Sequence, residues 1–149
     1  MKKSILILIV TLSLISCTSS NENENTNIIP NELLGTWKFV GYYDDNGNEP
    51  NGSNYHPIEN GGYTTFKNDN TLLSGINSDI TTIGTFSVSN DMIITFNYNA
   101  TSINPSSTYD EKILVLTDSV LEYRTTIDAP LFDIYRYEKV NPNTNISGK

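Results

Sequence analysis

From Leu33 onward, apolar and polar residues alternate in short runs separated by clusters of Asn, Asp, Gly and Ser. A period of two residues is typical of half-buried β-strands with turns between them. Thr, Tyr, Ile, Val and Phe, which favour strands, dominate these runs, and no long stretch shows helical periodicity. The pattern predicts eight strands, at about Gly35–Tyr43, Gly62–Lys67, Thr71–Ile76, Ile80–Ser89, Met92–Tyr98, Thr108–Leu116, Val120–Ile127 and Leu131–Val140.

The connections between these strands are mostly short, as at Asn68-Asp69-Asn70, so consecutive strands are expected to pair antiparallel. Eight such strands suit an all-β, up-and-down antiparallel barrel, which leaves no exposed edge. Such a barrel is just wide enough to be filled by side chains or to hold one small ligand. A two-sheet β-sandwich is the alternative, because periodicity does not separate the two architectures. Residues 142–149 read as a polar C-terminal tail.

The first residues have the features of an export signal. Lys2 and Lys3 precede an apolar run from Ser4 to Ile15, which is too short to span a bilayer and suits a signal peptide over residues 1–16. Leu14-Ile15-Ser16-Cys17 then resembles the bacterial lipobox. This resemblance implies that Cys17 becomes the first mature residue and carries lipid, palmitate included, so that the protein is anchored on a membrane without crossing it. The alternative is an ordinary secreted protein.

Residues 17–31 follow as the lipidated Cys and a Ser-, Asn- and Glu-rich tether, with the folded domain expected from 32 to 141. Thr18 stands directly after the cysteine. This resembles the Gram-negative sorting pattern for the outer membrane, because Asp at that position favours retention at the inner membrane. We therefore expect a lipid-anchored protein of the outer membrane, facing either the periplasm or the cell surface.

Composition narrows the classes of function. The chain has 149 residues, which suits one domain, and 17 acidic residues against nine basic ones give a net charge of −8. Without residues 1–16, seven basic groups stay against 17 acidic ones, and the net charge becomes about −10. So acidic a chain repels phosphate, which argues against a nucleic-acid partner. One Cys and one His exclude an intramolecular disulfide and a Cys/His zinc site.

Several motifs indicate a family. Gly35-Thr36-Trp37 resembles the Gly-x-Trp signature of lipocalins, in which the Trp packs across the closed end of the barrel. The resemblance implies that Arg136 stacks on Trp37, although Arg124 competes for this role. Three further segments resemble the lipocalin-like domain of bacterial lipoproteins, whose function is largely uncharacterised. They are Tyr63–Thr71, Gly84–Ile94 and Ile113–Leu121.

The resemblance extends from about Leu33 to Val140 and implies a cup without naming its contents. One departure is that the family's usual Asp-Gly turn is Asp69-Asn70 here, which Asn tolerates because it adopts positive φ. Asp118-Ser119-Val120 resembles a bacterial O-glycosylation acceptor, and its plain interpretation is a hairpin turn.

Catalytic and metal chemistry finds little support. Residues 44–49 are rich in oxygen ligands but lack the spacing of a calcium loop, and His56 has no second His or Cys beside it. Asp110 and Glu111 are adjacent, so on a strand they point to opposite faces. Glu122 and Asp133 face inward or outward according to a register that the sequence does not determine. We therefore expect no enzyme, no metal and no cofactor.

Two functional hypotheses follow. In the first, the barrel of a monomer binds a small, mostly apolar ligand, with Trp37 closing its floor. In the second, a packed barrel presents loops, above all Asp44–Gly61, to a protein partner of the cell envelope. An interior void would favour the first. The expected ligand-binding residues are Trp37, Phe39, Phe66, Phe86, Met92, Ile94, Phe96, Tyr123 and Arg136, and an aromatic wall near the mouth would comprise Tyr42, Tyr43, Tyr55 and Tyr63.

Overall fold

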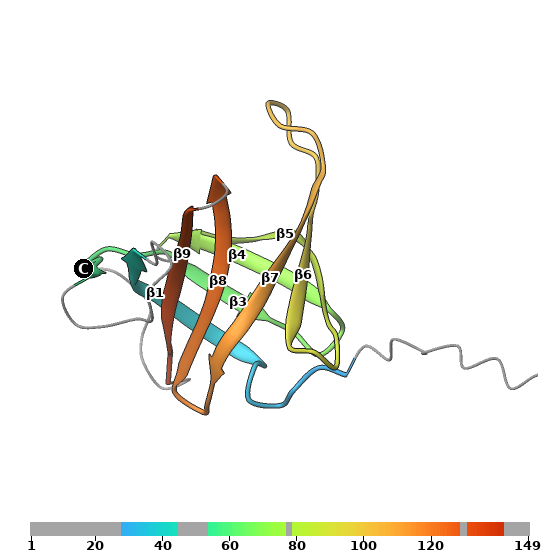
Figure 1. Cartoon of the computed structure of the whole chain (residues 1–149). Helices are drawn as coiled ribbons and strands as arrows, with labels where there is room; N and C mark the ends of the chain where they lie inside the picture. The colour runs from blue at the N-terminus through green and yellow to red at the C-terminus, as the bar shows by residue number, and fades with distance from the viewer. Residues whose placement is uncertain (1–27, 45–53, 77–78, 129–130, 142–149) are drawn as a thin grey trace, which may run out of the picture.

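The computed structural model describes residues 28–44, 54–76, 79–128 and 131–141, and these residues form one all-β structure (Figure 1). Within these ranges there is no helix long and apolar enough to cross a membrane. The strands are β1 (Gly35–Asp44), β2 (Tyr55–Pro57), β3 (Tyr63–Phe66), β4 (Thr71–Ile76), β5 (Asp79–Val88), β6 (Ile93–Tyr98), β7 (Ser107–Leu116), β8 (Val120–Asp128) and β9 (Leu131–Lys139).

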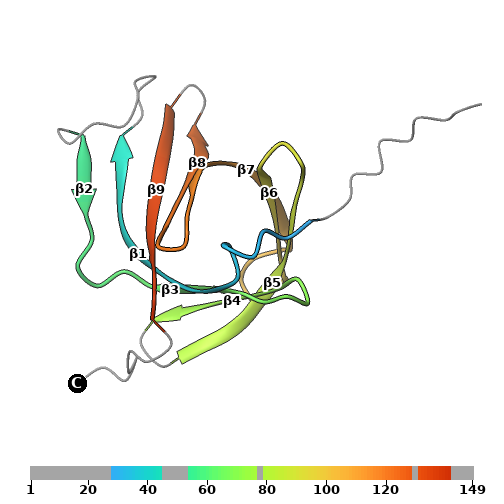
Figure 2. The same cartoon turned by 90° about the horizontal axis from the view of Figure 1, so that it is seen from below.

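The strands close into a barrel. From β3 to β9 each strand pairs antiparallel with the next, and β1 pairs with both β3 and β9. Seen along its axis, the sheet forms a ring (Figure 2). Closure between the first and last strands confirms the predicted eight-stranded barrel and excludes the β-sandwich, because a sandwich would leave these two edges unpaired with each other.

The short strand β2 was not predicted and lies within the segment expected to be a loop. It pairs with the end of β1, where Tyr42 is opposite His56, whereas β3 pairs with the beginning of β1. The two strands therefore follow the same edge of β1, interrupted by residues 58–62. At this interruption Gly61 approaches β1 so closely that an added Cβ would lie 1.9 Å from the Phe39 carbonyl oxygen, which leaves room only for glycine.

One end of the barrel is closed by residues 28–34, which pass across the ring (Figure 2). Leu33 is fully buried there, and the indole N–H of Trp37 donates a hydrogen bond of 2.7 Å to its carbonyl oxygen. An apolar core that includes Leu33 and Trp37 lies inside the barrel, since apolar side chains are stabilised by leaving water. It consists of Leu33, Trp37, Phe66, Leu72, Phe86, Val88, Ile94, Phe96, Ile113, Leu121 and Tyr137.

A β-bulge in β1 changes which tyrosine faces inward. The pairing with β9 shifts between Phe39 and Gly41, so Tyr42, not Tyr43, comes to lie opposite Tyr135. Because one extra residue reverses the alternation, Tyr43, which was expected in the aromatic wall near the mouth, does not share the inward face of Trp37 and Phe39. Tyr43 instead pairs with Ile134.

The β3–β4 turn follows the prediction. Asn70 adopts a φ of 67°, and the Asp69 carboxylate accepts a hydrogen bond of 3.0 Å from the Thr71 backbone N–H. Asn is among the few residues that tolerate this left-handed conformation, so it replaces glycine here.

Candidate binding cavity

A cavity of about 450 Å³ opens at the end of the barrel opposite Trp37. Its size lies within the range of roughly 300–1,000 Å³ that is usual for small-molecule sites. Strands β1, β3, β4 and β9 supply its walls, together with Gly62 before β3. The lining side chains are Phe39, Tyr42, Thr64, Ser74, Asp133, Tyr135 and Tyr137.

Aromatic rings form the apolar part of this wall. The Phe39 ring centroid lies 5.4 Å from that of Tyr135 and 5.2 Å from that of Tyr137. Behind them, Tyr123 stacks on Tyr137 at 5.4 Å, and their hydroxyl oxygens share a hydrogen bond of 2.8 Å. Burial raises the pKa of both Tyr123 and Tyr137, so these phenols stay neutral at physiological pH.

Glu111 brings a carboxyl group into the barrel interior. It lies opposite Ile94 of the core and is only 8% exposed. One carboxyl oxygen, Oε1, accepts a hydrogen bond of 2.6 Å from the Thr125 hydroxyl. The other oxygen, Oε2, is buried and has no hydrogen-bond partner within the described parts of the chain. Burial raises the pKa of Glu111, because a desolvated carboxylate loses its hydration.

A second carboxyl group, that of Asp133, lines the cavity directly. Asp133 lies opposite Thr125 on β8 and opposite Asp44 on β1. Burial raises the pKa of Asp133, the neighbouring Asp44 raises it further, and His56 opposes the shift. His56 itself is exposed and contacts the Asp44 carboxylate at 2.8 Å. Acidic side chains thus lie at the open end on β9 and β1, and a third, Glu111 of β7, is buried opposite Ile94.

A second hollow of about 460 Å³ lies beside the β6–β7 connection, which extends beyond the rest of the barrel (Figure 1). Tyr98 and Tyr109, packed edge to face at 5.9 Å, belong to its lining. Phe96 stacks on Tyr98 at 6.0 Å and lies 5.7 Å from Tyr123, so a row of rings leads from this hollow towards the first cavity.

The residues predicted to bind a ligand divide between the cavity and the packed core. Phe39 lines the cavity, and Tyr123 packs behind its wall. Met92, with a φ of 57°, lies in the β5–β6 turn and packs against the core. Trp37, at the closed end, belongs to the packed core. The others that belong to this core are Phe66, Phe86, Ile94 and Phe96.

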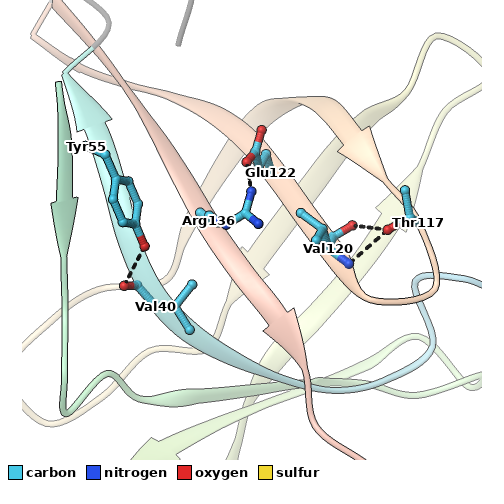
Figure 3. A network of polar contacts seen from close by, with 6 residues as sticks. All are labelled: Val40, Tyr55, Thr117, Val120, Glu122 and Arg136. Atoms are coloured by element: carbon cyan, nitrogen blue, oxygen red, sulfur yellow. Dashed lines mark hydrogen bonds and ion pairs between the residues drawn. The ribbon is translucent and has the colours of Figure 1, made fainter. Parts of the chain in front are cut away.

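The expected stacking of Arg136 on Trp37 is not observed. Arg136 lies next to Tyr135 on β9 and therefore points to the outer face, where it forms an ion pair with Glu122 of β8 (Figure 3). Lys139, directly opposite Trp37 on β9, takes the expected place, with its ammonium nitrogen 5.0 Å from the centre of the indole. The pairing also shows that Glu122 faces outward and Asp133 inward.

Of the expected aromatic wall, only Tyr42 lines the cavity. Tyr43 and Tyr55 pack against each other at 4.8 Å, and the Tyr55 hydroxyl donates to the Val40 carbonyl oxygen on the outside of β1 (Figure 3). Tyr63 pairs with Lys38, one position away from the inward-facing Thr64. The cavity residues that the sequence did not predict are Thr64, Ser74, Tyr135 and Tyr137, and Glu111 behind them. Only Tyr135 and Tyr137, two residues apart on β9, carried a signal of a shared face.

No group of three or more His, Cys, Asp or Glu side chains suited to a metal ion occurs among the residues that the structure describes. Cys17 and most of the loop at 44–49 lie outside those residues. Ser119 is exposed in the β7–β8 turn, in which the Thr117 hydroxyl accepts from the Val120 backbone N–H at 2.9 Å (Figure 3).

A family model described as "Lipocalin-like domain" matches residues 33–123, which run from the closed end of the barrel into β8. No curated protein matches the chain.

Proposed function

Because the chain belongs to the lipocalin-like domain family, and because its barrel holds a cavity, we propose that it binds a small, mostly apolar molecule inside the barrel. The cavity of about 450 Å³ is the observation that carries this proposal. Phe39, Tyr135 and Tyr137 supply apolar contact area, whereas Thr64 and Ser74 supply hydroxyl groups that can orient the ligand.

The alternative was a packed barrel that presents loops to a protein partner of the cell envelope. A filled interior would have favoured it, and the open cavity favours the binding function instead. Most of the loop that would contact such a partner, residues 45–53, lies outside the described residues.

The proposal includes the membrane anchor. The lipobox-like Leu14-Ile15-Ser16-Cys17 supports lipidation of Cys17, and Thr18 supports sorting to the outer membrane. A binding domain held there would take up its ligand from the periplasm or from the medium, according to the side on which it faces.

The proposal assigns binding and not catalysis. Glu111 and Asp133 both face inward, but β8 separates their strands and Thr125 already binds one oxygen of Glu111. These two carboxyl groups are assigned to ligand recognition.

The test is to identify what the full-length chain carries. The lipidated protein would be purified from membranes in nanodiscs of zwitterionic lipid, extracted with organic solvent, and analysed by mass spectrometry beside empty nanodiscs. We expect one compound near one equivalent per protein. The proposal would be refuted if the extract contains no compound and apolar probe molecules also do not bind to the protein.

A matched pair of variants connects the compound to the cavity. Ser74→Trp places a large ring on a lining position, and Thr85→Trp places the same ring on an exposed position of β5. Only Ser74→Trp should lose the compound. Equal retention in both variants would place the ligand elsewhere.

A further inference from the structure

The interior of this barrel is unusual for a purely apolar ligand, because it contains carboxyl groups among its aromatic rings. Asp133 lines the cavity, and Glu111 lies behind it with Thr125 between the two. A buried carboxylate is unfavourable unless a positive charge or a hydrogen-bond donor accompanies it. For Glu111, the Thr125 hydroxyl accompanies Oε1, and Oε2 has no partner in the described parts of the chain.

The protein's own cations do not fill this role in the described structure. Among the residues that the structure describes, no Lys, Arg or His lines either cavity. Arg136 points outward to Glu122, and Lys139 lies over Trp37 at the closed end. His56, an exposed basic group on β2, contacts Asp44 and stacks on Tyr42 at 4.9 Å.

The position of Glu111 is central within the row of tyrosines. Besides burial, which is the largest cause, the Glu111 charge raises the pKa of Tyr98 beside the second hollow. The same charge also contributes to the raised pKa of Tyr135 and Tyr137, which line the first cavity. In the structure, Glu111 lies two residues after Tyr109, which lines the second hollow, and it accepts a hydrogen bond from Thr125, which is opposite Asp133 of the first cavity. Both cavities are bordered by aromatic rings, whose negative faces attract cations within about 6 Å of the ring centre.

We propose that the barrel recognises a small organic cation, an amine or ammonium group on an apolar body, with Glu111 and Asp133 as its counter-charges and the tyrosine rings around it. This inference rests on the proposed binding function and specifies its ligand class. The charge of the amine would supply the partner that Oε2 of Glu111 lacks, while Phe39 and Tyr135 contact the apolar body. The net charge of −8 would also raise the local concentration of cations.

The test compares three probes of nearly equal size and different charge: 2-phenylethylamine, 2-phenylethanol and 3-phenylpropionate. Equilibrium dialysis at pH 7.5 would use the full-length lipidated chain in zwitterionic nanodiscs, with empty nanodiscs as the blank. We expect the amine to bind at least about tenfold more tightly than the alcohol, and the carboxylate to bind most weakly.

Three variants assign the selectivity to the barrel interior. Glu111→Gln and Asp133→Asn each remove an inward carboxylate, and each should lower the amine-to-alcohol ratio several-fold while binding of the alcohol persists. Asp110→Asn makes the same change of charge at the adjacent exposed position, where the carboxylate accepts from Thr95, and should leave the ratio unchanged. Persistent alcohol binding shows that a variant is folded.

The outcomes separate this inference from the proposal on which it rests. Equal binding of the amine and the alcohol, or selectivity for the amine that survives in both carboxyl variants, would refute the proposal of a cationic ligand without refuting the binding cavity. If none of the three probes binds, the proposal of a cationic ligand is also refuted. The solvent extraction would then decide separately whether the cavity carries a neutral molecule.

Discussion

The closed end of the barrel offers the sharpest test of the structure, through the substitution Trp37→Phe. Trp37 has no exposed surface, and its indole N–H donates to the Leu33 carbonyl oxygen at 2.7 Å. Phenylalanine removes the donor and leaves that carbonyl unsatisfied in the core, which costs about 1–3 kcal/mol. The smaller ring also leaves a void worth roughly 1 kcal/mol. The expected loss in the free energy of unfolding is therefore about 2–4 kcal/mol.

The measurement is urea unfolding of the chain from residue 18 onward, without lipid. Far-UV circular dichroism is the appropriate probe, because Trp37 is the only Trp and its fluorescence disappears in the variant. Lys139→Met provides the comparison. Its ammonium lies 5.0 Å from the indole and also donates to the Glu32 carbonyl oxygen, so its removal should cost only about 0.5–1 kcal/mol. A loss below about 0.5 kcal/mol for Trp37→Phe, or a larger loss for Lys139→Met, would refute the reasoning.

Three other predictions concern the cavity, the edge strand and the anchor. Burial raises the pKa of Glu111, so its contribution to stability is fully present below its unfolded pKa of about 4.3 and is lost as pH rises through the folded value. Glu111→Gln should therefore unfold at a higher urea concentration than the wild type at pH 8, with the difference vanishing at pH 4; identical midpoints at pH 8 would contradict the desolvation. Gly41→Ala puts a Cβ 2.5 Å from both the His56 carbonyl oxygen and the Tyr55 hydroxyl, so β2 should detach. Hydrogen exchange at the amides of His56 and Ile58, the second of which donates to the Val40 carbonyl oxygen, should then accelerate while the β4–β5 pairing stays protected, and unchanged exchange would count against this contact. Radiolabelled palmitate should enter the wild-type chain and not Cys17→Ala, and equal labelling of both would rule out the proposed lipid site.

The strand pattern could be predicted closely because alternation records which face of each strand is buried. The predicted strand Thr71–Ile76 coincides with β4, and the predicted strand Val120–Ile127 ends one residue before the end of β8. The short strand β2 was missed because it has only three residues, which follow an Asn/Gly-rich segment and end in Pro57, and so few residues carry no alternation to detect.

The candidate site was harder to predict, because it depends on where the alternation breaks. Because of the bulge between Phe39 and Gly41, Tyr42 faces the inside of the barrel and Tyr43 does not. No residue type in the sequence predicts such an insertion. The family resemblance implied that Arg136 stacks on the ring of Trp37, but the strand pairing places Lys139 opposite that ring. The register across β8 and β9 likewise decided that Glu122 faces outward and Asp133 inward, which the sequence left open.

The segment at residues 28–34 determines how the mouth of the barrel is oriented relative to an anchor. It crosses the closed end, so the chain towards Cys17 leaves on the side of Trp37, away from Asp133 and Ser74. Ten residues separate Cys17 from Ile28, and the eleven steps between their Cα atoms span at most about 40 Å when fully extended. If Cys17 carries the proposed lipid, the tether joins the barrel at its base and leaves the entrance free to face the water. A ligand could then be exchanged with the aqueous compartment without contact between the entrance and the bilayer.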